Sequence, residues 1–172
     1  GVAIRRVLEA NILVTVLMAV LLLPLLVGIP SLYSWARAAV TAADPVLQHK
    51  SPYLNVPFFV VRAVIYFAVW IGLALLLNRW SRQQEATTVP HAREAIDTWL
   101  RQFGGPGVVL YGLTMTFAAF DWTMSLEPHW YSSIYGVFLI AGQVAATLAF
   151  AIVVLTWLRP RTALTTVLTS QH

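Results

Sequence analysis

Cysteine is absent from the 172 residues of this chain, and charged side chains are scarce. Without cysteine, the chain forms no disulfide and offers no thiolate for nucleophilic chemistry or for metal clusters. Aspartate, glutamate, lysine and arginine make up only 10% of the residues, whereas ordinary soluble domains contain roughly 25%. Hydrophobic residues reach 59%, and the mean hydropathy is +0.73. Because so few polar groups cannot cover a soluble surface, the composition predicts a membrane protein.

Histidine is missing from the places where a membrane haem would need it. A haem inside a bilayer takes axial ligands at depth, usually histidines on facing helices. The four histidines all fall in predicted loops or at the chain end: His49, His91, His129 and His172. The sequence also contains no phosphate-binding loop and no nucleophile–base motif. We therefore expect no cofactor, no metal and no catalytic residue in this chain.

Four apolar runs are long enough to cross a bilayer, for which a helix needs about 20 residues. They predict an all-α fold, a bundle of four transmembrane helices at about residues 7–29, 55–77, 107–126 and 131–158. A cleaved signal peptide is the alternative for the first run, because Arg5 and Arg6 precede it, but the run is longer than such peptides require. Since the chain opens without methionine, we expect it to be a segment of a longer polypeptide.

The basic residues are distributed unequally between the two sides of the predicted bundle. One side carries eight arginines: Arg5, Arg6, Arg79, Arg82, Arg93, Arg101, Arg159 and Arg161. The other side carries Arg37 and Lys50. The positive-inside rule then places both ends of the segment in the cytoplasm. This distribution accounts for the net charge of +4 without a nucleic-acid partner.

Two connections between the predicted spans are too long to be simple turns. In residues 88–106, Thr88 is a potential cap, Pro90 a potential first helical residue and the Gly104–Pro106 segment a potential stop. Residues 30–45 show the same pattern, with Ser31 as cap and Asp44-Pro45 as stop. Both patterns predict short helices that lie in the membrane interface.

Arg62 and Asp121 are charged residues within predicted spans. Arg62 lies about 10 Å along its helix from Asn55, and Asp121 lies about 7 Å from the end of the third span, at about 1.5 Å per residue. Both distances are measured from the same membrane face, so the two residues lie at similar depth. Because an isolated charge inside a bilayer is costly, we expect the guanidinium and the carboxylate to pair, directly or through water.

Other polar residues share helix faces with this pair. Tyr66 lies on the side of Arg62, and Tyr111 and Thr114 lie on the side of Asp121. Such stripes predict either a water-filled proton path or hydrogen bonds that hold the helices together. Glu127 and His129 follow in the turn, where they suit proton entry or exit or are simply solvated. These two side chains alone do not make a metal site.

Three stretches resemble one family of membrane subunits: "FAAFDWTMSLEPHWYSSIYG" (117–136), "KSPYLNVPFFVVRAVIYFAVW" (50–70) and "RRVLEAN" (5–11). They are similar to the polysulfide-reductase-like (NrfD-type) integral subunits of bacterial alternative complex III, a quinol:cytochrome c oxidoreductase, and above all to its ActF-like subunit. Asp121, Glu127 and His129 match the block in that family, and Arg62 matches the arginine of its second span.

The resemblance implies a multi-pass subunit of the bacterial inner membrane, with about ten spans of the length that a bilayer requires. Iron–sulfur clusters and c-type haems would then belong to other subunits. The expected partners are a paralogous membrane subunit, an iron–sulfur subunit, c-type cytochromes, lipid and a terminal oxidase. The implied contribution is a proton path coupled to quinol oxidation, together with subunit docking.

Three other functions fit the same residues. The segment could be a purely architectural anchor, in which the polar groups only lock helices together. It could bind quinone, with Tyr111, Trp122 and Trp130 around the ring, although aromatic residues at a membrane interface explain these positions equally well. A small transporter or channel is the third alternative.

Overall fold

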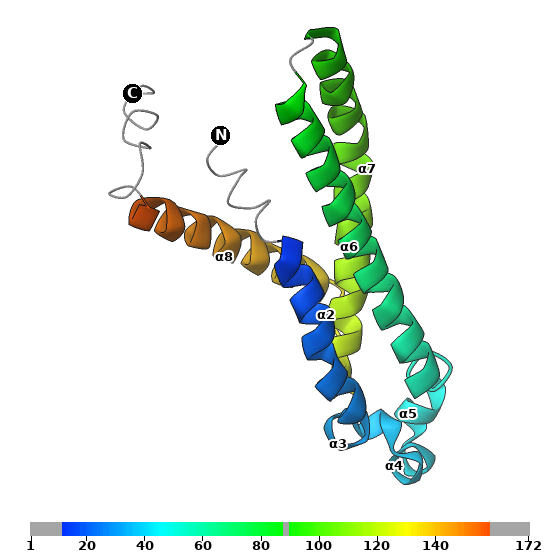
Figure 1. Cartoon of the computed structure of the whole chain (residues 1–172). Coiled ribbons are helices and arrows are strands. Elements are labelled where there is room, and N and C mark those ends of the chain that lie inside the picture. The colour runs from blue at the N-terminus through cyan, green and yellow to red at the C-terminus, as the bar shows by residue number, and fades with distance from the viewer. Residues whose placement is uncertain (1–11, 88–89, 159–172) are drawn as a thin grey trace.

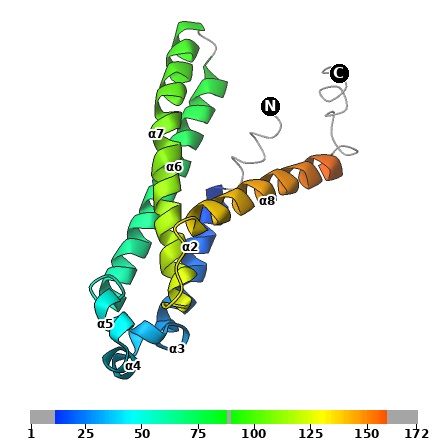
Figure 2. The same ribbon diagram turned by 180° about the vertical axis from the view of Figure 1, so that it is seen from behind.

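The structure is a computed structural model that describes residues 12–87 and 90–158, and this part of the chain is helical without strands (Figures 1 and 2). Three helices are long and apolar enough to cross a membrane: α6 (Val56–Ala86), α7 (Pro90–Trp122) and α8 (Tyr135–Leu158). Most of their apolar side chains are exposed, as a lipid environment requires. The all-helical fold predicted from composition is therefore confirmed, and the length and apolar composition of these three helices support the predicted membrane protein.

The first predicted span, residues 7–29, corresponds to the shorter apolar helix α2 (Ile12–Val27). Its 16 residues extend about 24 Å at about 1.5 Å per residue, which is less than the roughly 30 Å of hydrocarbon. The predicted start of this span at residue 7 lies outside the described residues, as does the predicted cap Thr88. Four spans in one bundle therefore stay a prediction.

Helices α6 and α7 form a long antiparallel pair that exceeds the predicted spans (Figure 1). Helix α6 continues from the predicted end at residue 77 to Ala86, and α7 already begins at Pro90. At about 1.5 Å per residue, the 31 and 33 residues extend about 46 and 50 Å. Since the hydrocarbon is roughly 30 Å thick, both helices are long enough to continue beyond it.

The predicted interfacial helix at residues 88–106 is wrong as a separate element. Residues 90–106 are the first part of α7, which runs through Gly104, Gly105 and Pro106 without ending. The glycines cost helix stability, about 1 kcal/mol each, but do not forbid the conformation. Packing against α6 offsets this cost, because the rings of Phe103 and Trp80 lie 5.4 Å apart. Tertiary contact has thus overridden the local stop signal.

The segment between α2 and α6, residues 28–55, is called the arm here. Its short helices are α3 (Ile29–Leu32), η1 (Ser34–Ala36), α4 (Ala38–Ala43) and α5 (Pro45–Lys50). The single interfacial helix predicted for residues 30–45 is therefore wrong. Ser31 lies inside α3 and donates to the Gly28 carbonyl rather than capping a helix. Asp44 does end α4, as predicted, but it also caps α5 by accepting from the Val46 and Leu47 amides.

A cluster of large buried residues joins the arm to the start of α6. Tyr33, Trp35 and Phe59 are at most 4% exposed, and their ring centroids lie 5.1 to 5.4 Å apart. Ile29 and Leu47 complete this core at 1% exposure. The Tyr33 hydroxyl also donates to the Trp122 carbonyl at 3.0 Å, at the end of α7. The arm is therefore held against the ends of both long helices.

Helix α8 contacts α7 near its first turns and then projects away from α2, α6 and α7 in both views (Figures 1 and 2). Its first residue is Tyr135, whereas the predicted span began at residue 131. Residues 131–134 are not helical. At the crossing, a Cβ on Gly136 would lie 2.8 Å from the Thr116 Cα. Only a glycine allows the two backbones to approach this closely.

Replacing Gly136 with alanine should push α8 away from α7. The new methyl group would meet backbone, which cannot rotate aside, and such overpacking costs about 1–3 kcal/mol. Gly142→Ala is the matched control on the same helix, because a Cβ added there would have no neighbour within 4 Å. In detergent unfolding followed by tryptophan fluorescence, G136A should lower the free energy of unfolding and G142A should not. Equal stabilities would contradict the close crossing.

Candidate functional site

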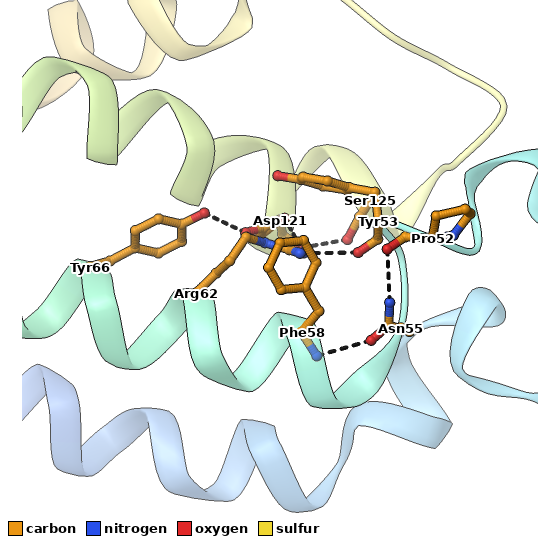
Figure 3. Close-up of polar contacts among 8 residues, drawn as sticks. All are labelled: Pro52, Tyr53, Asn55, Phe58, Arg62, Tyr66, Asp121 and Ser125. Atoms are coloured by element: carbon orange, nitrogen blue, oxygen red, sulfur yellow. Dashed lines mark hydrogen bonds and ion pairs between the residues drawn. The ribbon is translucent and has the colours of Figure 1, made fainter.

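Arg62 and Asp121 form a direct ion pair inside the helix pair (Figure 3). The guanidinium Nε donates to Asp121 Oδ2 at 2.8 Å, and Nη2 donates to Oδ1 at 2.8 Å. The Tyr66 hydroxyl donates to Oδ2 at 2.6 Å. Asp121 is fully buried, and Arg62 is 7% exposed. The pairing predicted from equal depth is confirmed, and the contact is direct rather than through water.

Local helix geometry determines where these three side chains lie. Asn55 caps α6 by accepting from the Phe58 amide at 3.0 Å, which starts the helix at the predicted position. Arg62 and Tyr66 are four residues apart and so share one face of α6. Asp121 lies in the last turn of α7, where the Ser125 hydroxyl donates to its backbone carbonyl. The beginning of one helix and the end of the other therefore meet at this pair.

Two aromatic residues that sequence reasoning missed enclose the guanidinium. The ring centroids of Tyr53 and Phe58 lie 3.9 and 4.2 Å from the Arg62 Cζ atom. The Tyr53 carbonyl also accepts from Arg62 Nη1 at 3.0 Å (Figure 3). The spacing of four residues between Phe58 and Arg62 could have indicated the first contact. Tyr53 precedes the helix, so no periodicity indicated the second.

Arg62 and Asp121 are each other's counter-charge in this buried site. Each carboxylate oxygen receives a guanidinium N–H, and removal of either partner would leave the other charge buried and unpaired, which is costly. The charge also affects tyrosines of the arm. Burial first, and the negative charge of Asp121 second, raise the pKa of Tyr33 and of Tyr53 to about 12 each. Both hydroxyls therefore stay protonated at neutral pH.

Thr114 lies farther along α7 and does not contact the ion pair. Its hydroxyl accepts from the Trp70 indole at 3.0 Å and donates to the Leu110 carbonyl at 2.8 Å. Trp70 stacks on Tyr66 at 6.2 Å between ring centroids, so aromatic surface separates the two polar groups. Within the described residues, no continuous hydrogen-bonded chain connects Asp121 with Thr114, and the predicted proton path stays a prediction.

A cavity of about 1080 Å³ lies between α2, α6, α7 and α8. Its walls are mostly apolar, and two of the three residues predicted to bind quinone, Tyr111 and Trp122, line it. Tyr111 donates to Gln143 Oε1 at 2.8 Å across the cavity. The third residue, Trp130, does not line this cavity and instead packs edge-on against Tyr135.

Glu127 and His129 lie in the turn after α7, which contains the short helix η2 (Met124–Leu126). His129 Nε2 lies 2.8 Å from Asp44 Oδ2, and its Nδ1 lies 3.6 Å from Glu127 Oε1. Lys50 donates to the Pro128 carbonyl at 2.5 Å. Asp44 and Lys50 were not predicted to join this group, because they come from the distant arm. In the described part of the chain, no three acidic or histidine side chains are placed to share a metal ion.

Comparison with known proteins adds no assignment to this geometry. No protein-family model and no curated protein matches the chain.

Replacing Arg62 with lysine should destabilise the helix pair although the charge is retained. An ammonium group cannot reproduce the two-bond fork and the contact with the Tyr53 carbonyl together. Losing hydrogen bonds to a charged group costs about 1–3 kcal/mol. The control Arg79→Lys changes an exposed arginine of the same helix and should stay within about 0.5 kcal/mol of wild type. Equilibrium unfolding in mixed micelles measures the difference, and equal effects would contradict the arrangement.

Proposed function

We propose that this chain is a membrane-embedded part of a quinol:electron-acceptor oxidoreductase of the alternative complex III type. The resemblance of residues 117–136 and 50–70 to the NrfD-type subunits of that complex supports this assignment. Within such a complex, the described helices serve as architecture. They hold a membrane unit together and present its surface to other subunits, and the redox centres belong to those subunits.

The observation that carries the architectural role is the complete engagement of the Arg62–Asp121 pair. A proton carrier must accept and release a proton within the working pH range. Asp121 instead receives both guanidinium bonds and the Tyr66 bond, so each of its carboxylate oxygens is already held by a protein donor. Arg62 also donates from Nη1 to the Tyr53 carbonyl of the arm. The pair thus joins α6, α7 and the arm. These contacts of Arg62 and Asp121 are called the lock here.

A proton path is the competing role for the same residues, and one variant separates the two. Asp121→Asn leaves Arg62 buried without a counter-charge. If the pair is a lock, the amount of assembled complex should therefore fall by more than about half. The proton-path role predicts normal assembly with loss of proton translocation. The assay purifies the tagged full-length protein from native membranes and measures co-purifying c-type haem, quinol oxidation and proton release.

Two further variants complete this test. Glu94→Gln removes an exposed carboxylate of α7 and should leave assembly unchanged. The double variant R62M/D121L removes both buried charges and should restore assembly, because a buried ion pair is often replaceable by apolar residues. If D121N assembles normally and the double variant is inactive, the lock is wrong. If wild-type protein carries no c-type haem subunit, the assignment to this kind of complex is wrong.

Quinone binding is the second candidate function, and the cavity between the four apolar helices favours it. Its volume of about 1080 Å³ is sufficient for a ring and part of its tail, since ligand pockets are commonly about 300–1,000 Å³. Trp70, Trp122 and Tyr111 offer aromatic faces there, and Gln143 offers an amide. An apolar cavity with few polar groups suits a flat ring that carries hydrogen-bonding oxygens.

Tyr111→Phe should weaken quinone binding if this cavity is the site. Loss of one hydrogen-bonding hydroxyl corresponds to about a two- to tenfold increase in Kd. The full-length protein in nanodiscs can be titrated with decylubiquinone, with tryptophan fluorescence quenching as the readout. Tyr131→Phe, at an exposed tyrosine that does not line the cavity, is the control. Equal Kd values for all three proteins would exclude Tyr111 from the site.

A further inference from the structure

A second charged cluster lies outside the helix pair, between the arm and the turn formed by residues 123–134. His129 is at its centre, with Asp44 Oδ2 at 2.8 Å from Nε2 and Glu127 Oε1 at 3.6 Å from Nδ1. The side chain of His129 is 54% exposed and that of Asp44 22% exposed. Solvent protons therefore reach the imidazole directly, unlike the buried Asp121 carboxylate.

The charge state of His129 determines how strongly the ring interacts with Asp44 and Glu127. A neutral imidazole carries one N–H, so it can donate to only one of two carboxylates. The imidazolium carries a positive charge, so it attracts both carboxylates. Asp44 Oδ2 lies 2.8 Å from Nε2, and Glu127 Oε1, at 3.6 Å from Nδ1, lies within ion-pair distance but beyond a hydrogen bond. Both attractions act only when the ring is protonated.

We propose that Asp44, Glu127 and His129 form a proton-sensitive latch, which fastens the arm to the 123–134 turn when His129 carries its proton. The arm provides Asp44, at the junction of α4 and α5, and the turn provides the other two residues. The inference does not depend on the proposed quinol complex, because it uses only contacts within this chain.

The latch is connected to the buried ion pair through the arm itself. Shortly after Asp44 and α5, the chain reaches Tyr53, whose carbonyl accepts from Arg62 Nη1 at 3.0 Å. Lys50 forms a second tether by donating to the Pro128 carbonyl. Lysine keeps its charge throughout the neutral range, so this tether stays while the latch opens. Release of His129 therefore loosens the arm without freeing it.

The pH limits of the latch follow from its charged groups, which are Asp44, Glu127, His129 and the neighbouring Lys50. Histidine changes its charge between about pH 5 and 8, so the imidazolium contacts are present at the acidic end and are lost as the pH rises. On the acidic side, limited desolvation raises the pKa of Asp44, but the Val46 and Leu47 amides and His129 together lower it. Asp44 therefore stays ionised until the pH falls below its ordinary range, where its contribution is lost.

Hydrogen exchange in the full-length protein in nanodiscs tests the latch. Backbone amides of residues 38–50 and 127–134 are measured at pH 6 and pH 8, after correction for intrinsic exchange rates. The wild-type protein should lose protection by about two- to fivefold between pH 6 and pH 8, the range expected for an exposed ion pair. His129→Gln should show the pH 8 level at both pH values.

Three further variants make the result specific. His49→Gln, which removes the histidine that belongs to the arm itself, should keep the wild-type pH dependence. Lys50→Met should lower protection equally at both pH values. Combining Asp44→Asn with His129→Gln should cost no more protection than either change alone. Wild-type protection that does not change with pH, or a pH dependence that survives in H129Q, would overturn the latch.

Discussion

An ion pair buried between apolar helices is stable only if hydrogen bonds compensate both partners for the lost water. Asp121 meets this condition through Arg62 and Tyr66, and Arg62 meets it through Asp121 and the Tyr53 carbonyl. Three features of the fold bring these groups together. Helices α6 and α7 are antiparallel, the start of α6 lies beside the end of α7, and the arm folds back so that the Tyr53 carbonyl reaches the guanidinium.

Tight packing is concentrated at this end of the molecule. The Tyr33, Trp35 and Phe59 rings cover the start of α6, and Tyr33 also binds the end of α7. Along the helices, in contrast, most apolar side chains are exposed. This division suits a membrane protein, because lipid solvates apolar helix faces but cannot solvate the polar ends, turns and charges. The polar groups consequently gather where the protein itself can satisfy them.

Sequence reasoning succeeded where a single physical cost dominated. Arg62 and Asp121 had to be paired because the bilayer penalises each alone, and the helix rise placed them at one depth. The same reasoning could not identify Tyr53, Asp44 or Lys50 as partners, because they reach the long helices only through the fold of the arm. The stop predicted at Gly104–Pro106 also failed, since contact with α6 offset a local preference.

Composition and helix geometry by themselves determined the apolar character of the chain, the helical class and the pairing of the two buried charges. These properties depend on transfer free energies and helix geometry, which each stretch of sequence carries locally. Tertiary structure alone decided that α7 continues through a proline, that α8 crosses α7 closely at Gly136, and that His129 meets the arm. Those outcomes depend on contacts between residues far apart in the chain, and the energy of such contacts exists only once the helices have packed.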